Sequence, residues 1–183
     1  MSQTIILPGY GGSGEAHWQT LWERADAGMV RFQPSSWDQP DLQDWITALD
    51  RAVAAASEPP LLVAHSLACL LVPHWAAARP DRRIAGAFLV AVPDPDGPQF
   101  PEEAPSFRAV PDRTLPFPTL IIASTDDPFG TTAHAERRAR AWGAGFIEVG
   151  ALGHINSSSG LGDWPLGAKL LSAFRAGLRH QAG

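Results

Sequence analysis

Short apolar segments rich in β-branched residues recur along this chain, and segments with helical periodicity separate most of them. Each apolar segment is bounded by Gly, Pro, Asp or Ser, as strands commonly are. Strands that are apolar without alternation are covered on both faces, and strands that alternate with helices form parallel sheets. The chain is therefore predicted to have an α/β fold, a three-layer sandwich with about six mostly parallel strands. The predicted strands span residues 4–7, 29–32, 61–64, 84–92, 119–123 and 146–149.

Five segments have apolar residues at the three- and four-residue spacing that places them on one face of a helix. In the first of these, Trp18, Leu21, Trp22 and Ala25 share a face. The third contains Pro73, which lacks an N–H donor and clashes with the preceding turn, so we expect a kink or an early break there. The predicted helices span residues 16–27, 41–56, 66–79, 131–142 and 162–179.

The composition fits one folded domain over residues 1–183 and argues against several classes of protein. Hydrophobic residues make up 45% of the 183 residues, enough for a buried core, so the chain is not predicted to be disordered. The formal net charge is −5 without a long run of like charge, which argues against nucleic acid as a partner. The longest apolar run, residues 84–92, ends at Pro93 and is too short to span a membrane.

Cysteine usage constrains the compartment and the metal content. Cys69 is the single cysteine, so no internal disulfide can form, and a reducing cytoplasm is the simplest expectation. Cys and His spacings typical of a metal site are absent from the sequence. We therefore expect a cytoplasmic protein that needs no metal and no organic cofactor.

The loop after the third predicted strand carries a candidate nucleophile. The sequence Ala64-His65-Ser66-Leu67-Ala68 lies between a predicted strand and a predicted helix. This is the setting of the nucleophile elbow, G-x-S-x-G, in which a serine sits on a strained, tight turn. Ala replaces Gly at both flanking positions and adds only a methyl group to each. Ser66 is therefore the predicted nucleophile, with an ordinary helix-capping serine as the alternative.

The ends of the fifth and sixth predicted strands supply the two other groups that an activated serine needs. Asp126 and Asp127 follow the fifth strand, and His154 follows the sixth. The resulting order Ser, Asp, His is that of α/β-hydrolases. A serine hydroxyl needs an imidazole to take its proton, and the imidazole needs a carboxylate to fix its tautomer. Pro128 favours an extended form of the residue before it, which points to Asp127 as that carboxylate, and Asp126 stays the alternative.

The glycine-rich loop after the first predicted strand has two interpretations. In a hydrolase its backbone N–H groups point at the developing oxyanion, and we expect the amides of Tyr10 and Leu67 to form the oxyanion hole. Alternatively, the segment from Gly9 to Gly14 matches the G-x-G-x-x-G fingerprint of dinucleotide-binding proteins. Such a site needs an acidic residue at the end of the second strand, and residues 30–34 contain none, which favours the hydrolase.

These motifs together resemble one family. The sequence resembles the small serine hydrolases related to retinoblastoma-binding protein 9 in five places. These are the segment from Ile5 to Gly9, the pair His17-Trp18, the elbow at His65-Ser66, the loop 124–129 and the pair Gly153-His154. The resemblance covers essentially the whole chain. It implies a compact α/β-hydrolase with Ser66 as nucleophile, His154 as base and Asp127 as the orienting carboxylate. The chain departs from many members at Ala64 and Ala68, where they carry Gly.

The predicted function is that of a serine hydrolase of the esterase type, which cleaves a small-molecule ester through Ser66, His154 and Asp127. The competing class is a binding protein that keeps the fold without turnover. The sequence does not decide the oligomeric state, and a homodimer is one expectation.

Two features are expected to shape the site. Seven prolines interrupt residues 93–117, so a helical cap domain is excluded there, and short acyl esters are the expected substrates. Gly9 and Trp164 are predicted to contact the substrate, because glycine lets the backbone approach it and Trp164 falls near the expected mouth. Trp37 and Phe129 fall in segments that could line the same mouth. His17 either touches the pocket or caps a helix.

Overall fold

The computed structural model describes residues 3–181. Its six strands form one sheet in the order β2-β1-β3-β4-β5-β6, and every neighbouring pair is parallel. The predicted α/β class and six-stranded parallel sheet are confirmed, and the predicted strand ends differ from the observed ones by two residues or fewer. The strands are β1 (Thr4–Leu7), β2 (Met29–Arg31), β3 (Leu61–His65), β4 (Gly86–Val90), β5 (Thr119–Ala123) and β6 (Gly145–Glu148).

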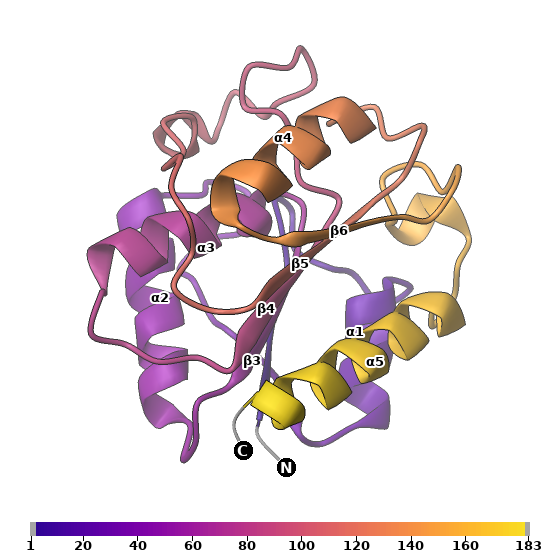
Figure 1. The fold of residues 1–183 in the computed structure, drawn as a ribbon. Helices are drawn as coiled ribbons and strands as arrows, with labels where there is room; N and C mark the ends of the chain where they lie inside the picture. Colours follow the sequence, from indigo (N-terminus) through magenta and orange to yellow (C-terminus); the bar gives the residue numbers. More distant parts are fainter. Residues whose placement is uncertain (1–2, 182–183) are drawn as a thin grey trace.

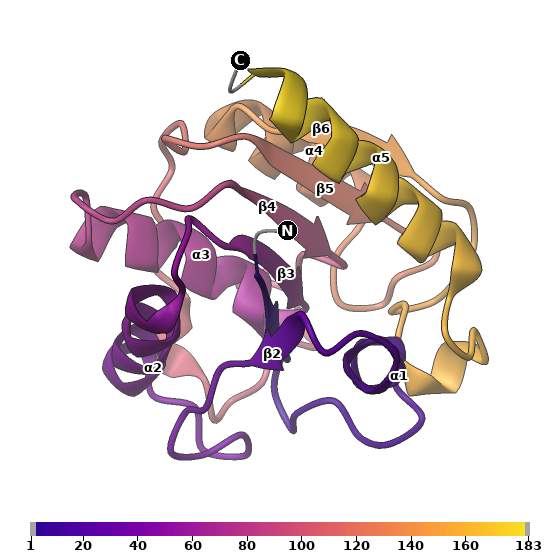
Figure 2. The same cartoon turned by 90° about the horizontal axis from the view of Figure 1, so that it is seen from below.

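Helices cover both faces of the sheet (Figures 1 and 2). Successive side chains of a strand point to opposite faces. In β1, Ile5 and Leu7 join the core cluster formed with α2, α3 and α4, whereas Ile6 joins the cluster formed with α1 and α5. The predicted three-layer sandwich is therefore confirmed. The helices are α1 (Trp18–Ala25), α2 (Leu42–Ala55), α3 (Leu67–Ala78), α4 (Thr132–Trp142) and α5 (Pro165–Gln181), with two short 3₁₀ turns, η1 (Pro105–Phe107) and η2 (Ser157–Ser159).

Three helices begin where a side chain accepts a hydrogen bond from an otherwise unpaired backbone N–H. The accepting residues are His17 for α1, Asp41 for α2 and Thr131 for α4. α5 begins at Pro165, three residues later than predicted, because Trp164 has a φ of 47°, outside the right-handed helical region. The other predicted helix starts lie within two residues of the observed ones.

α3 continues through Pro73, so of the two expected outcomes, a kink or an early break, the early break is wrong. The proline removes the N–H that would otherwise donate to the carbonyl of Cys69. Leu70, Leu71 and Val72 just before it are fully buried, and α3 packs between the sheet and α2. The burial of these side chains offsets the lost hydrogen bond.

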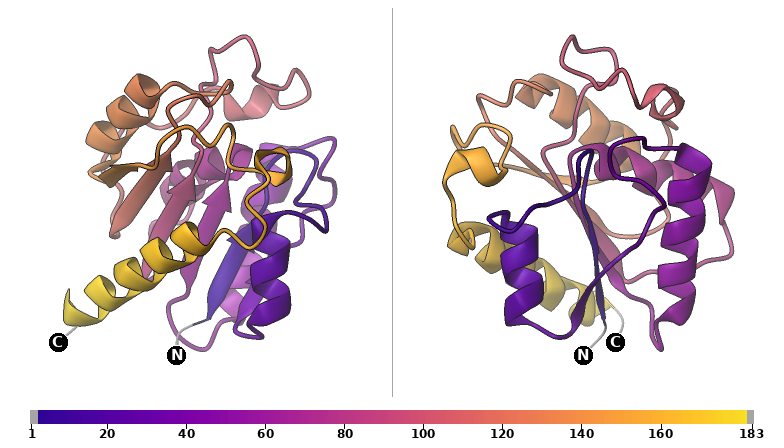
Figure 3. Two further views of the ribbon diagram at one scale, coloured as in Figure 1. Left: turned by 90° about the vertical axis from the view of Figure 1, so that its right-hand side faces the viewer. Right: turned by 180° about the vertical axis from the view of Figure 1, so that it is seen from behind.

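Residues 93–117 leave the sheet after β4 and contain a single 3₁₀ turn, η1, and no α-helix. The lack of a helical cap in this segment, which its prolines predicted, is confirmed. The segment lies beyond the carboxyl ends of the strands (Figure 3), and Phe100, Ala104 and Phe107 anchor it in the core. In the described part of the chain, no helix is both long and apolar enough to cross a membrane.

Candidate active site

The turn between β3 and α3 holds Ser66 in a strained conformation. Its φ of 55° and ψ of −126° lie outside the regions that L-residues favour. The Ser66 N–H donates to the Val90 carbonyl at 3.0 Å, and the Cys69 N–H donates to the Ser66 carbonyl at 2.8 Å. Ala64 and Ala68, on either side, are fully buried. The tight turn of a nucleophile elbow therefore forms with Ala at both flanking positions.

Gly9 packs directly against this turn. A Cβ atom at Gly9 would lie 2.9 Å from the His65 carbonyl oxygen and 2.9 Å from Ser66 Cβ. Both distances are shorter than real contacts of a Cβ atom, and backbone atoms cannot move away cheaply. The absence of a side chain at Gly9 therefore allows the glycine-rich loop to lie against the elbow.

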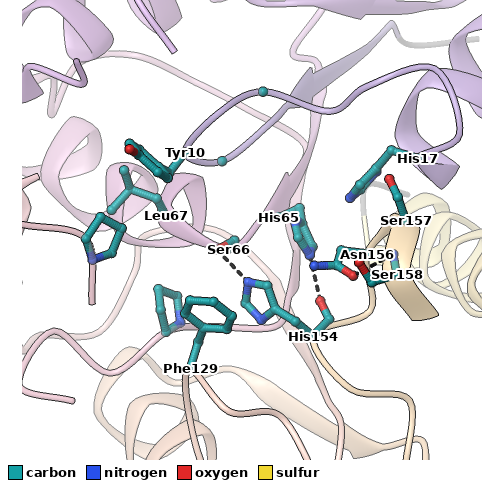
Figure 4. Close-up of a pocket in the computed structure, with 14 residues that line it drawn as sticks. Tyr10, His17, His65, Ser66, Leu67, Phe129, His154, Asn156, Ser157 and Ser158 are labelled. Atoms are coloured by element: carbon teal, nitrogen blue, oxygen red, sulfur yellow. Dashed lines mark hydrogen bonds between the residues drawn. The ribbon is translucent and has the colours of Figure 1, made fainter. Parts of the chain in front are cut away.

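His154 lies between Ser66 and Asp127. Its Nε2 atom is 2.8 Å from Ser66 Oγ, a contact drawn in Figure 4. Its Nδ1 atom is 2.8 and 2.9 Å from the two carboxylate oxygens of Asp127. Because the carboxylate accepts from Nδ1–H, Nε2 of the neutral ring is left to accept from the Ser66 hydroxyl. The three residues lie at or just after the ends of β3, β5 and β6, so the parallel sheet brings them together at its carboxyl edge.

The neighbouring carboxylates of Asp126 and Asp127 face different partners. Asp127 is buried, and its Oδ1 also accepts from the Phe129 N–H at 2.9 Å. Asp126 is exposed, and its Oδ1 accepts from Ser124 Oγ at 2.8 Å and from the Gly153 N–H at 2.7 Å. These two hydrogen bonds lower the pKa of Asp126, and the bond from Ser124 has the larger effect. Asp126 therefore ties the loop after β5 to the loop after β6, and Asp127 is the carboxylate beside the imidazole.

Two backbone N–H groups near Ser66, those of Tyr10 and Leu67, have no acceptor among residues 3–181. In contrast, the Gly11 N–H one residue further along donates to the Trp37 carbonyl at 2.9 Å. Leu67 is the first residue of α3, where helical N–H groups lack partners within the helix. Both unpaired amides belong to residues that line the same cavity as Ser66, where they can donate to an oxyanion.

The cavity at this site has a volume of about 310 Å³. The ring of Phe129 lies against the ring of His154, with centroids 4.2 Å apart. None of the lining side chains is an Asp, Glu, Lys or Arg. The lining residues are Gly9, Tyr10, Gly12, His17, His65, Ser66, Leu67, Pro93, Pro101, Phe129, His154, Asn156, Ser157 and Ser158.

The model of one protein family, described as serine hydrolase, matches residues 4–173 of this chain. The chain belongs to the serine hydrolase family. The matched range includes the elbow at Ser66, the glycine-rich loop and the loops that carry Asp127 and His154. A comparison with curated proteins found no match.

Solved structures with the same fold include other hydrolases. A protein assigned as a YdeN-like hydrolase of Pectobacterium atrosepticum is 31% identical, with a TM-score of 0.84 over 96% of this chain and 91% of that chain. The ydeN gene product of B. subtilis is 22% identical, with a TM-score of 0.78 over 96% of this chain and 100% of that chain. A monoacylglycerol lipase of Paleococcus ferrophilus is 15% identical, with a TM-score of 0.69 over 97% of this chain and 92% of that chain. The last two share the fold alone.

His65 supports the loop of His154 in this serine hydrolase. Its Nε2 atom lies 2.9 Å from the His154 carbonyl oxygen, so Nε2 carries the proton and donates. Burial, with the rings of His154 and His17 nearby, lowers the pKa of His65 well below its ordinary value. His65 is therefore a neutral ring that fixes the backbone of the residue facing Ser66.

The tryptophans expected near the mouth of the site lie elsewhere. Trp164 is 2% exposed, and its ring packs against those of Trp18 and Trp22 at centroid distances of 5.2 and 6.1 Å. The predicted substrate contact of Trp164 is therefore wrong, because the turn before α5 folds this ring onto α1. Trp37 packs against Phe32 and Trp45 and also does not line the cavity. Gly9 and Phe129 line it as expected.

Sequence reasoning missed Gln19, a fully buried side chain that connects the ends of β1 and β3. Its Nε2 donates to the carbonyls of Leu7 and Val63, each at 3.2 Å, and its Oε1 accepts from Ser13 Oγ at 2.6 Å. Leu7 and Val63 lie just before the glycine-rich loop and the elbow, so Gln19 holds these two turns together. The sequence feature that could have indicated its role is a single amide side chain next to Trp18 and near Trp22 on a helix face predicted to be buried.

Proposed function

We propose that this serine hydrolase cleaves small carboxylic esters, with Ser66 as nucleophile, His154 as base and Asp127 as the carboxylate that orients His154. The observation that carries the proposal is the continuous chain of contacts from Asp127 through His154 to Ser66 Oγ, beside an uncharged cavity. A hydroxyl, an imidazole and a carboxylate come from three different strand ends and meet here. The stability of the fold does not require these three groups to be in contact. The resemblance of the sequence to relatives of retinoblastoma-binding protein 9 supports the same assignment.

In the first half of the reaction, Ser66 Oγ attacks the ester carbonyl carbon while its proton passes to His154 Nε2. The carbonyl oxygen becomes an oxyanion, which accepts hydrogen bonds from the Tyr10 and Leu67 amides. The carbon–oxygen bond to the alcohol then breaks, and the departing oxygen takes the proton from His154 Nε2. An acyl-Ser66 ester remains.

In the second half, a water molecule gives its proton to His154 Nε2 and attacks the acyl carbon. The oxyanion forms again at the same amides, and the bond to Ser66 Oγ breaks as that oxygen regains its proton. The carboxylic acid leaves and the free enzyme is restored. Asp127 keeps the proton of the neutral ring on Nδ1 and stabilises the imidazolium that forms in both halves. These steps need no metal and no organic cofactor.

The cavity supports a preference for short acyl chains. Residues 93–117 contribute Pro93 and Pro101 to its lining but no cap helix, so little apolar surface surrounds a long chain. Each fully buried methylene contributes about 0.8 kcal/mol, and methylenes that stay in water contribute none. Across p-nitrophenyl acetate, butyrate, octanoate and palmitate, kcat/KM is expected to peak at the short chains. A continued rise through palmitate would contradict this preference.

The dinucleotide-binding alternative receives no support from the glycine-rich loop. Gly9 lies against the elbow, and the loop's unpaired Tyr10 amide belongs to the cavity that Ser66 lines. At the end of β2, where a ribose-binding acid would stand, Arg31 forms an ion pair with Glu23 of α1. Arg31 therefore occupies the position that dinucleotide binding assigns to an acid.

Pre-steady-state hydrolysis of p-nitrophenyl butyrate tests the proposed function. We expect a burst of p-nitrophenol close to the enzyme concentration, because p-nitrophenolate is a good leaving group and acylation of Ser66 should be faster than deacylation. Ser66→Ala is expected to lose the burst. Ser35→Ala, which changes a serine bonded to Asp44 on the surface, serves as the matched control and should keep it. No turnover by the wild-type enzyme on any of the four esters would contradict the proposal and favour a binding protein on this fold.

A further inference from the structure

The cavity has polar groups on one side of the candidate triad. In Figure 4, Tyr10 and Leu67 lie on one side of Ser66, whereas His17, Asn156, Ser157 and Ser158 lie beyond His154 on the other. The loop 156–158 begins two residues after His154 in the sequence. The polar side is therefore built by the loop that follows His154 and by His17 at the start of α1.

His17 presents a defined donor on this side. Its Nδ1 accepts from the Gln19 N–H at 3.2 Å, so in the neutral ring the proton is on Nε2. The side chain is 4% exposed, and Nε2 is buried without an acceptor among residues 3–181. Burial, with Arg31 and His154 nearby, lowers the pKa of His17 to about 4, so the ring is neutral at ordinary pH. An unpaired buried N–H is unfavourable, and an acceptor carried by a ligand in the cavity would satisfy it.

The neighbouring polar groups are also uncharged. Asn156 Oδ1 accepts from the Ser158 N–H at 3.0 Å, which leaves its amide nitrogen as a donor. The exposed hydroxyls of Ser157 and Ser158 make no hydrogen bond within the described part of the chain. Since no ionic side chain lines the cavity, this side matches a neutral ligand rich in oxygen atoms.

The direction of proton transfer decides which part of an ester occupies this side. The departing alcohol oxygen takes its proton from His154 Nε2, so the alcohol must lie next to that ring. The acyl group then extends toward the other side of Ser66, where Leu67 lies (Figure 4). His17 and the loop 156–158 therefore surround the leaving group.

We propose that this enzyme prefers esters whose leaving group is an uncharged polyol, such as glycerol or a sugar alcohol, and that His17 Nε2–H donates to one of its free oxygens. The inference rests on the proposed ester hydrolysis. The ester oxygen of the polyol takes the proton from His154 as the carbon–oxygen bond breaks, while a second oxygen stays bonded to His17. His17 is thus a specificity residue for the leaving group.

Two esters with the same acyl group test the inference. Glyceryl 1-butyrate and 2-methylbutyl butyrate differ in whether the leaving group carries hydroxyls or methyl groups of similar size. We expect the wild-type enzyme to have the higher kcat/KM for the glyceryl ester, measured by release of butyrate. His17→Asn should lower the ratio of the two kcat/KM values about tenfold, the range expected for one lost hydrogen bond to a buried donor.

The choice of variants separates recognition from folding. Asn keeps an acceptor for the Gln19 N–H and is a good helix cap, but it has no atom at the position of Nε2. His17→Gln places an amide N–H near that position and should recover part of the ratio. His134→Asn is the matched control, because His134 is equally buried with an unpaired Nε2 but lines a different cavity. It should leave the ratio unchanged.

The results distinguish this inference from the proposed function. Suppose that the wild-type enzyme hydrolyses p-nitrophenyl butyrate. The polyol inference alone is then overturned if the enzyme does not prefer the glyceryl ester, or if His17→Asn leaves the ratio of the two kcat/KM values unchanged. Loss of the ratio in His134→Asn as well would also overturn it, because the effect would then not come from the leaving-group side. Failure to hydrolyse any ester would overturn the proposed function itself.

Discussion

Two regions of the site differ in the contacts that hold them in place. The strand-end loops follow β3, β5 and β6, and the completing segments, residues 93–117 and 156–158, supply further lining of the cavity. The strand-end loops are joined to one another by buried or charged hydrogen bonds, such as those from His65 Nε2 to the His154 carbonyl and from Gly153 N–H to Asp126. The completing segments contain only 3₁₀ turns, and their cavity-lining serines are exposed. The candidate triad thus rests on the sheet, whereas part of the cavity lining comes from segments that the fold constrains less.

The first prediction concerns the largest effect, at the strand ends. Ser66→Ala and His154→Ala should each lower kcat for p-nitrophenyl butyrate by as much as the double variant does, on the order of 10⁶-fold, because the two residues act as a unit. Steady-state kinetics of the three variants measure this. Losses that multiply in the double variant would show that the two side chains act independently.

The second prediction separates the two adjacent carboxylates. Asp127→Asn should lower kcat by up to ~10⁴-fold, because an amide no longer fixes the tautomer of His154. Asp126→Asn keeps the carboxylate beside the imidazole and is expected to lose far less activity while it lowers the melting temperature. The opposite order of the two kcat values would transfer the orienting role to Asp126.

The third prediction concerns the fit of the glycine-rich loop to the elbow. Gly9→Ala should lower kcat by about 10²- to 10³-fold, the effect of losing an oxyanion donor, because the new Cβ would displace the loop that carries the Tyr10 amide. Gly14→Ala is the matched control, since a Cβ there has no atom within 4 Å. Similar losses in both variants would argue against this close approach as the cause.

The fourth prediction is a smaller effect on stability in acid. His17 has a pKa of about 4 when folded and an ordinary value of 6.5, so below pH 6.5 the unfolded chain binds a proton that the folded chain does not. The free energy of unfolding should therefore fall as the pH decreases from 6.5 toward 4, by on the order of 3 kcal/mol at most for this group. Urea unfolding at several pH values measures the slope, and His17→Asn should make it shallower. An equal slope in that variant would assign the acid sensitivity to other groups, such as the buried ring of His65.

The sequence predicted the strand-end loops better than the surroundings of the cavity. The meeting of Ser66, Asp127 and His154 was predictable because a parallel sheet places the ends of its strands at one edge, whatever the loops between them do. The position of Trp164 was predicted wrongly because its own backbone has a positive φ, and its ring packs against Trp18 of α1. The contact of His65 with the His154 carbonyl joins residues far apart in the chain, and no local pattern reports it.

The helix through Pro73 shows the same limit within the fold. The local rule for proline predicts a kink or a break, but the packing of α3 against both the sheet and α2, which carries the helix past Pro73, depends on contacts distant in sequence. The sequence of segment 156–158 did not indicate that it lines the cavity, because serine and asparagine are common in loops that have no function. Periodicity and strand order are local properties, whereas the lining of a cavity is set by the tertiary structure.

The central claim is that Ser66 is an activated nucleophile, and covalent labelling tests it most directly. A fluorophosphonate probe reacts with a serine whose hydroxyl is deprotonated by a neighbouring base, and intact-mass and peptide analysis identify the modified residue. We expect one adduct per chain on the peptide that contains Ser66, loss of the adduct in Ser66→Ala, and a strongly slowed reaction in His154→Ala. No labelling of the folded wild-type protein, or equal labelling of wild-type and Ser66→Ala, would contradict the account.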